Sequence, residues 1–233
     1  MFGILDIGNS NFHLAMISGD NVSEYYTVDC DRDGELERIL EEKRIDRLVI
    51  SYVSLKCYSK LKELNCETII LGDEVKARLS WSYKSMGMDR IANVYYLIKN
   101  GISGIIISFG TMFVIDVVKD GDFKGGFIFP GYNSQVECVN LKSDFIEISP
   151  SRSTDEQPAK NTEGAVKAGI FSILKNGIAG VTRALYKRYD IKKTIITGGD
   201  SRFQKYLDGE YDRYLTIKGI KLLAEDVYGC NWR

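Results

Sequence analysis

The chain has 233 residues, of which 44% are hydrophobic and 27% charged, as is usual for a soluble globular protein. Its 31 lysines and arginines balance 32 aspartates and glutamates, so the net charge of −1 argues against general nucleic-acid binding. The number of cysteines, five, is odd, and no two of them have the C-x-x-C spacing of a zinc site or a redox pair. This indicates reduced thiols.

The N-terminal residues Met1–Gly8 have neither the basic region nor the long apolar stretch of a signal peptide. No run approaches the roughly 18 apolar residues that a membrane span needs. The sequence therefore predicts a cytoplasmic protein.

The first half begins with two apolar stretches, Phe2–Leu5 and Phe12–Ile17, on either side of a turn at Gly8. This pattern predicts two strands joined by a tight turn. The apolar spacing further along predicts, in order, the helix Gly34–Arg44, the strand Leu48–Val53, the helix Cys57–Leu64, the strand Thr68–Leu71 and the helix Met88–Asn100, which Gly101 closes.

The second half begins in the same way, with strands and tight glycine turns. Strands are predicted over Ile105–Ser108, Met112–Val118 and Phe123–Phe129, followed by the loop Ser149–Asn161. The later elements are the helix Thr162–Tyr189 with Gly177 and Gly180 as points of bending, the strand Thr194–Ile196, and the helices Ser201–Leu207 and Ile217–Tyr228.

An internal repeat relates the two halves. When Ile4–Asp20 is set over Ile106–Asp122, a shift of 102 residues, Gly8 falls on Gly110, Asn9 on Thr111, Gly19 on Gly121 and Asp20 on Asp122. Matching both turns in register indicates a duplication. We therefore expect an α/β protein with two ribonuclease-H-like domains, 1–101 and 102–233, and a cleft between them.

The segment Asp6–Ser10 is the first candidate site. The Gly8 turn lets backbone N–H groups approach a phosphate, and Asp6 at the strand end could hold Mg²⁺ directly or through water. The alternative is an ordinary polar turn, in which Asp and Asn are common.

The segment Gly87–Arg90 at the start of a predicted helix also has two interpretations. Asp89 could complement the helix dipole while Arg90 is solvated. Alternatively, Asp89 accepts a hydroxyl proton and Arg90 holds an anionic group of a substrate.

Other features are weaker. The glycines of Ser108–Thr111, Gly125–Gly126 and Gly198–Asp200 could each approach a nucleotide, but glycines mark turns in every fold. The sole histidine, His13, is expected to face outward, and it supports no Ser-His-Asp or metal mechanism. Small residues on the long helix fit close packing: Ala165, Gly169, Ser172 and Asn176.

Together these segments resemble the type III pantothenate kinases, a family of the acetate/sugar kinase–Hsp70–actin superfamily. The family's motifs D-x-G-N-[ST], a Tyr four residues before G-x-D-R, D-x-G-T-A-x-T-x-D, G-G-x-[IL]-x-P-G, T-x-x-[AG]-V-x-x-G and G-G-D occur here in order. They correspond to Asp6–Ser10, Tyr83, Gly87–Arg90, Ser108–Asp116, Gly125–Gly131, Thr162–Gly169 and Gly198–Asp200.

The resemblance implies an actin-like ATPase fold and an ATP-dependent kinase that phosphorylates pantothenate, the first step of coenzyme A biosynthesis. It implies a homodimer with a shared active site and the use of Mg²⁺ and of K⁺ or NH₄⁺. Asp89 would accept the proton of the pantothenate hydroxyl. The nucleotide-binding residues would be Asp6, Ile7, Gly8, Asn9, Ser10, Asn11, Phe12, His13 and Thr111. The pantothenate-binding residues would be Tyr83, Gly87, Met88, Asp89, Arg90 and Thr162, with Thr162 reaching the partner's site.

The chain departs from the family at Ser108, which replaces the Asp that helps to bind the monovalent cation, and also at Met112 and Val114. A neutral hydroxyl cannot supply the charge of a carboxylate, so we expect altered K⁺ dependence. A non-catalytic or regulatory relative with the same fold and dimer is therefore a second interpretation. A larger sugar kinase or actin-like ATPase is a third, although the chain lacks room for their inserted subdomains.

Overall fold

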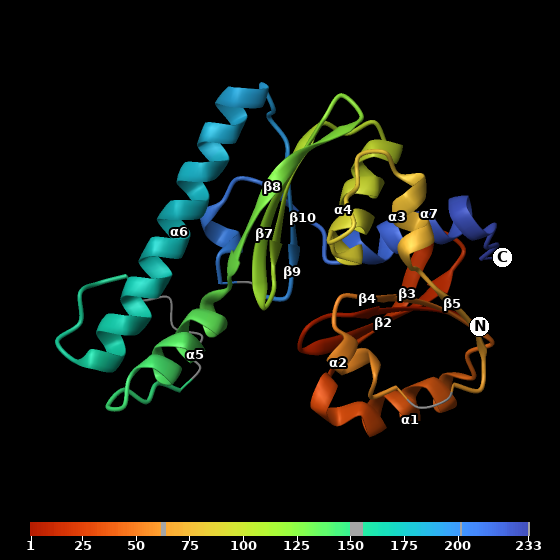
Figure 1. Ribbon diagram of the computed structural model, residues 1–233, viewed down its shortest axis with the longest axis horizontal. Coiled ribbons are helices and arrows are strands. Elements are labelled where there is room, and N and C mark those ends of the chain that lie inside the picture. The colour runs from red at the N-terminus through yellow and green to blue at the C-terminus, as the bar shows by residue number, and fades with distance from the viewer. Residues whose placement is uncertain (62–63, 150–155, 201, 233) are drawn as a thin grey trace. The chain divides into compact units, whose positions relative to one another are not determined.

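The computed structural model describes residues 1–61, 64–149, 156–200 and 202–232, which form two compact α/β units (Figure 1). The first unit combines residues 1–101 with 214–233, and the second contains residues 102–213. The chain thus passes from one unit to the other after residue 101, where the sequence divides the halves. The C-terminal segment, which the sequence groups with the second half, packs in the first unit.

The first unit contains a five-stranded sheet in the order β3-β2-β1-β4-β5. Strand β1 lies at its centre, antiparallel to β2 and parallel to β4. The strands are β1 (Phe2–Ile7), β2 (Asn11–Ser18), β3 (Asn21–Asp29), β4 (Arg47–Tyr52) and β5 (Glu67–Ile70).

Helices cover both faces of this sheet (Figure 1). On one face, Leu36 and Ile39 of α1 pack in a core with Leu5 and Ile7 of β1. On the other face, α4 and α7 pack on each other and against the sheet. The helices of this unit are η1 (Cys30–Arg32), α1 (Asp33–Lys43), α2 (Leu55–Tyr58), α3 (Asp73–Arg78), α4 (Met88–Lys99) and α7 (Leu215–Tyr228).

The second unit repeats this plan with the sheet order β10-β9-β6-β7-β8. Its strands are β6 (Gly104–Phe109), β7 (Met112–Lys119), β8 (Asp122–Pro130), β9 (Thr194–Gly198) and β10 (Glu210–Tyr211), and its helices are α5 (Tyr132–Lys142), α6 (Thr162–Tyr189) and η2 (Gln204–Tyr206). Buried aromatic rings fill the core between the sheet and α6, among them Phe109, Phe113, Phe171 and Phe203. Helix α6 is a single element, so Gly177 and Gly180 do not split it.

The two sheet orders confirm the duplication, because β1, β2, β3, β4 and β5 correspond to β6, β7, β8, β9 and β10. The register expected from the sequence is correct only for the first strand. The loop between β1 and β2 has three residues, 8–10, whereas the loop between β6 and β7 has two, 110–111. The equivalence therefore changes from a shift of 102 to a shift of 101 after this loop, and Asp20 rather than Gly19 corresponds to Gly121.

Two predicted helices are shorter in the structure. The predicted helix Cys57–Leu64 is α2, which starts at Leu55 and ends at Tyr58, because three-residue turns follow it, such as Leu61 N–H to the Tyr58 carbonyl at 3.1 Å. Residues 62–63 of that prediction lie outside the described residues. The predicted helix Ser201–Leu207 is only the short η2, since its hydrogen bonds also span three residues, and position 201 is likewise not described.

Five elements of the described residues were not predicted: β3, η1, α3, α5 and β10. Strand β3 lies at a sheet edge, where residues 24–26 are all half-buried and the alternation of buried and exposed residues is lost. Helix α5 buries only Tyr132 and Val136, so its apolar face is too narrow to give a helical pattern. Of the predicted loop Ser149–Asn161, residues 150–155 lie outside the described part of the chain.

A close crossing of α4 and α7 joins the C-terminal helix to the first unit. A Cβ atom at Gly219 of α7 would lie 2.0 Å from the carbonyl oxygen of Ala92 in α4. Beside this contact, the Thr216 hydroxyl donates a hydrogen bond of 3.0 Å to Oδ1 of Asn93. Only glycine at position 219 permits this approach.

We predict that Gly219→Ala lowers the free energy of unfolding by about 1–3 kcal/mol, because the added methyl group must push the two helices apart. Gly177→Ala is the matched control, since nothing lies within 4 Å of a Cβ atom there. In a helix interior it should be neutral or stabilise by about 0.5–1 kcal/mol. Urea unfolding curves measure both effects, and equal midpoints for the two variants would contradict the crossing.

Candidate active site

Asp6 lies near the end of the central strand β1 and is 8% exposed. Its neighbours Leu5 and Ile7 belong to the core on the α1 side. Because successive side chains of a strand point to opposite faces, Asp6 projects toward the face that α4 and α7 cover. In the sheet register it stands opposite His13 of β2 and Ser51 of β4.

The carboxyl group of Asp6 is electrostatically unfavourable as an anion. Burial, and after it the negative charge of Asp89, raise its pKa from 3.8 to about 7, while the Ser51 hydroxyl acts in the opposite direction. Oδ1 of Asp6 and Oγ of Ser51 are buried without a hydrogen-bond partner among the described residues. A buried carboxylate oxygen of this kind is suited to a cation or to a water molecule bound to one.

Asp89 lies in the first turn of α4, which begins after Gly87. Its Oδ1 accepts a hydrogen bond of 2.8 Å from the Arg90 backbone N–H. A Cβ atom at Gly87 would lie 2.5 Å from that oxygen, so the glycine leaves the space that the carboxylate occupies. Burial raises the pKa of Asp89, while the hydrogen bond and charge of Arg90 partly compensate. The helix-dipole interpretation of Asp89 is therefore compatible with an acid–base role.

Arg90 is only 5% exposed, so the expectation of a solvated side chain is wrong. Its Nη1 donates a hydrogen bond of 2.5 Å to the Tyr83 hydroxyl, and its guanidinium carbon lies 5.9 Å from the centre of the Tyr83 ring. Tyr83 itself is 44% exposed. The arginine is thus held at the start of α4, beside Asp89, with an accessible aromatic ring next to it.

The loop between β1 and β2 exposes Asn9 and Ser10, and the Gly8 N–H donates to the Asn11 carbonyl at 2.9 Å. Ile7 and Phe12 on either side are fully buried in the core, so only their backbone atoms can face a ligand. His13 is half-buried, with Nδ1 at 3.1 Å from the Tyr25 hydroxyl. It therefore does not simply face solvent.

The remaining predicted residues lie in the second unit. Ser108 is half-buried on β6 between Val114 and Thr197, Thr111 is exposed in the loop after β6, and Thr162 is the exposed first residue of α6. Asn161 caps α6, as expected, by accepting the Gly164 N–H at 2.7 Å. In the duplicated strands Ser108 corresponds to Asp6, so a hydroxyl occupies the position of the buried carboxylate. That these residues share one cleft with Asp6 and Asp89 remains a prediction.

The donor set fits Mg²⁺ bound together with phosphates. Within residues 1–61, 64–149, 156–200 and 202–232, no group of three or more His, Cys, Asp or Glu side chains could hold a metal ion. Mg²⁺ keeps several waters and is commonly bound by one or two carboxylates and the substrate's phosphates. Asp6, with its unpartnered Oδ1, can supply such a carboxylate.

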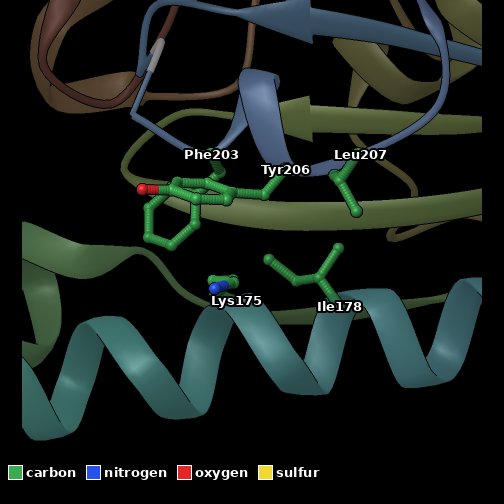
Figure 2. Close-up of a pocket in the computed structure, with 5 residues that line it drawn as sticks. All are labelled: Lys175, Ile178, Phe203, Tyr206 and Leu207. Carbon is green, nitrogen blue, oxygen red and sulfur yellow. The ribbon is translucent and has the colours of Figure 1, made fainter. Parts of the chain in front are cut away.

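Two cavities in the second unit are poorer candidates. Figure 2 shows Lys175 and Ile178 of α6 facing Phe203, Tyr206 and Leu207, and the space between them does not admit a water molecule. An open cavity of about 870 Å³ lies where β9 and β10 begin, and its lining mixes lysines and arginines with acidic residues. Ligands of α/β sheets bind at the other, carboxyl ends of the strands.

Among the helices of the described residues, none combines the length and apolar character of a membrane span.

The duplicated units define an α/β protein of the actin-like ATPase fold. Near the carboxyl end of its first sheet, the buried Asp6 lies close enough to the half-buried Asp89 for their charges to interact. The family model described as type III pantothenate kinase matches residues 4–184. The chain therefore belongs to the type III pantothenate kinase family.

Individual relatives agree with this assignment. The chain is 31% identical over 198 residues to the type III pantothenate kinase of Sulfurihydrogenibium sp., covering 79% of each chain. It is 29% identical over 251 residues to that of Geotalea daltonii, covering 97% of this chain and 98% of the other. A crystal structure described as a Baf family transcriptional activator from Campylobacter jejuni is 25% identical, with a TM-score of 0.64 over 98% of this chain and 100% of the other.

Sequence reasoning missed Ser51, which lies buried beside Asp6. Its signal was present, because Ser51 interrupts the apolar run Leu48–Ile50 at the end of a predicted strand. A polar residue at that point of β4 lies beside Asp6 of β1, toward the carboxyl end of the same sheet.

We predict that Asp6→Asn stabilises the ligand-free protein at pH 8 but not at pH 4. An acid whose pKa is raised on folding destabilises the folded state when it is ionised. The wild type therefore loses stability as the pH rises above 3.8, the pKa of the unfolded state, and the loss is complete above about pH 7, the pKa of the folded state. A difference of that size corresponds to about 4 kcal/mol.

The measurement is urea unfolding in EDTA at several pH values between 4 and 8. Asp144→Asn, at an exposed loop position, is the control for removal of a surface carboxylate. A stability difference between Asp6→Asn and the wild type that stays constant with pH would contradict the buried, strained carboxylate.

Proposed function

We propose that this protein transfers the γ-phosphoryl group of ATP to the primary hydroxyl of pantothenate, giving ADP and 4′-phosphopantothenate. This product enters coenzyme A biosynthesis, and we place the enzyme in the cytoplasm. The observation that carries the proposal is the pairing of the buried Asp6 with the half-buried Asp89, with Arg90 adjoining, in a chain of the type III pantothenate kinase family.

The residues of the first unit divide the work. Asp6 would hold Mg²⁺ together with the phosphates of ATP, and the ion would supply positive charge to the transferring phosphoryl group. The exposed backbone of the Gly8–Ser10 loop contacts the phosphates. Asp89 accepts the proton of the attacking hydroxyl, for which its raised pKa is favourable.

Arg90 and Tyr83 bind pantothenate. The pantothenate carboxylate is an anion, and a guanidinium group can bind it through two parallel hydrogen bonds. Tyr83 holds Arg90 in place and offers an accessible ring to the substrate's apolar part. The backbone of Gly87 and Met88 completes this side, while Thr111 contacts ATP from the second unit.

A non-catalytic relative of the same fold is less well supported. Two carboxyl groups whose pKa values are both raised by burial destabilise the folded chain at neutral pH. A protein that needed only the fold and the dimer would be more stable without them. Strain of this kind is typical of a site that binds a cation or transfers a proton.

The direct test is a coupled assay of ADP release from ATP and Mg²⁺, with and without pantothenate, in Na⁺, K⁺ and NH₄⁺ buffers. We expect ADP formation that depends on pantothenate in at least one buffer. Its absence in all three would reject the kinase.

Asp89→Asn tests the proton acceptor. The amide cannot take the hydroxyl proton, so kcat should fall by about 10²–10⁴-fold, while the far-UV spectrum and the affinity for nucleotide persist. Steady-state kinetics provide the measurement. A kcat within a few-fold of the wild type would remove Asp89 from the mechanism.

We propose that the monovalent-cation dependence is weak because Ser108 lacks the carboxylate that binds K⁺ or NH₄⁺ in the family. Ser108→Asp restores a charge at the position that corresponds to Asp6, and we expect activity to become more sensitive to K⁺. The assay compares kcat/KM across a K⁺ titration at constant ionic strength. If the variant responds to K⁺ as the wild type does, position 108 lies outside the cation site.

We also propose a homodimer whose interface lies on the second unit. Large apolar side chains are exposed there on α5, α6 and the loop that follows α5: Leu141 is 84%, Phe145 98% and Ile173 72% exposed. Apolar surface of this kind marks a protein interface, and a second copy covers it in this proposal. Thr162, at the start of the same helix, then reaches the partner's pantothenate site.

Ile173→Glu should shift the protein from dimer to monomer in sedimentation velocity, because it places a charge in the apolar interface. Leu55→Glu is the matched control, since Leu55 is also 71% exposed but lies in the first unit. A dimer that survives Ile173→Glu, or that Leu55→Glu disrupts equally, would place the interface elsewhere.

A further inference from the structure

The phosphate loop of the first unit, Gly8–Ser10, is fixed from its inner side by two donors. The thiol of Cys57 donates a hydrogen bond of 3.3 Å to the Asn9 carbonyl oxygen. The backbone N–H of Cys30 donates one of 2.9 Å to the Ser10 carbonyl oxygen. Both successive carbonyl groups of the loop are therefore bound to the part of the unit that η1 and α2 form.

These two bonds set the direction of the loop's amide groups. In a trans peptide the C=O and the following N–H point in opposite directions, and every described peptide bond of this chain is trans. Binding the Asn9 and Ser10 carbonyls inward thus turns the N–H groups of Ser10 and Asn11 outward. Outward N–H groups on a short loop are the arrangement that binds phosphate oxygens.

The thiol of Cys57 is placed for this purpose rather than for reactivity. It is 2% exposed, and the hydroxyl of Ser54 accepts the Cys57 backbone N–H at 3.2 Å, which fixes the first turn of α2. A buried thiol is a weak nucleophile but can still donate a hydrogen bond.

The corresponding loop of the second unit is also held by two donors, but both of them bind the same carbonyl group. The Thr111 carbonyl accepts a hydrogen bond of 2.9 Å from the Gly131 N–H and one of 2.8 Å from the Ser134 hydroxyl. Thr111 corresponds to Ser10 and Gly131 to Cys30, both with the shift of 101 residues that holds after the first loop. One backbone donor and one side-chain donor thus hold each of the duplicated loops.

We propose that Cys57 is a positioning residue for the nucleotide: its S–H donor holds the Asn9 peptide so that the loop presents its N–H groups to the phosphates of ATP. Cys57 itself touches no substrate. This role rests on the proposed function of the loop, but not on the identity of the phosphate acceptor. It assigns to a buried thiol a share of the affinity for ATP and none of the affinity for pantothenate.

The test compares Cys57→Ala, which removes the donor, with Cys57→Ser, which replaces S–H by O–H. Cys66→Ala is the matched control, because Cys66 packs against the same core without contacting the loop. The dissociation constant for Mg²⁺ with a non-hydrolysable ATP analogue is measured by calorimetry, and KM for ATP and for pantothenate by the coupled assay.

Cys57→Ala should weaken analogue binding and raise KM for ATP by about three- to tenfold, the effect of one net hydrogen bond. KM for pantothenate should stay unchanged. Cys57→Ser should recover most of the loss, and Cys66→Ala should bind as the wild type does. Wild-type affinity in Cys57→Ala, no recovery in Cys57→Ser, or an equal rise in both KM values would overturn the proposal.

If Cys57→Ala melts below the assay temperature, Cys57→Val and Cys57→Thr repeat the comparison, since they have the same shape and differ only in the donor. Tighter analogue binding by the threonine variant is expected, and equal binding would overturn the role of the donor. A wild type that binds the analogue but does not phosphorylate pantothenate would reject the proposed function and leave this comparison decisive.

Discussion

The constraint on which the proposed site depends is that the first unit holds two carboxyl groups near one another, one buried and one half-buried. Asp6 ends the central strand, Asp89 begins a helix, and the charge of one raises the pKa of the other. Repulsion between buried like charges costs several kcal/mol unless a cation or a proton relieves it. In the proposed reaction, Mg²⁺ and the transfer of the hydroxyl proton would relieve this repulsion.

The fold supplies each carboxyl group with a rigid support. Asp6 is fixed by hydrogen-bonded strands on both sides, β2 and β4. Asp89 is fixed because α4 packs closely on α7, where Gly219 allows the helix backbones to approach. The C-terminal helix thus acts on the site without contributing a proposed catalytic residue, and its position in the first unit follows from this contact.

Much of this arrangement can be read from the sequence, because it depends on local patterns. The glycine turns and apolar strands predict the duplication, and the motifs Asp6–Ser10 and Gly87–Arg90 predict two parts of the proposed site. Other features depend on contacts between distant residues and leave little local signal. The interpretation of Arg90 as a solvated side chain, one of the two that the sequence allowed, is excluded by its burial and its hydrogen bond to Tyr83, which come from tertiary packing. The repeat register was wrong because a loop differs by one residue.

The same distinction explains Cys57 and Ser51. From the sequence alone, Cys57 is interpreted as a buried core residue. Its hydrogen bond to Asn9 joins residues 48 positions apart in the chain, so no local pattern indicates it. Ser51 can be recognised as a neighbour of Asp6 only from the register of the two parallel strands β1 and β4. Sequence motifs predict which residues can react or bind a ligand. The residues that position those side chains are identified only from tertiary contacts.

The most direct measurement of the central claim is a ¹³C NMR titration of the Asp6 side-chain carboxyl in the ligand-free protein, assigned with the Asp6→Asn variant. The account predicts a pKa of about 7. It also predicts a lower pKa in Asp89→Asn and a lower pKa when Mg²⁺ and the ATP analogue bind, since each change removes or offsets a negative charge. An Asp6 pKa near 3.8 that neither change affects would contradict the coupled carboxyl pair.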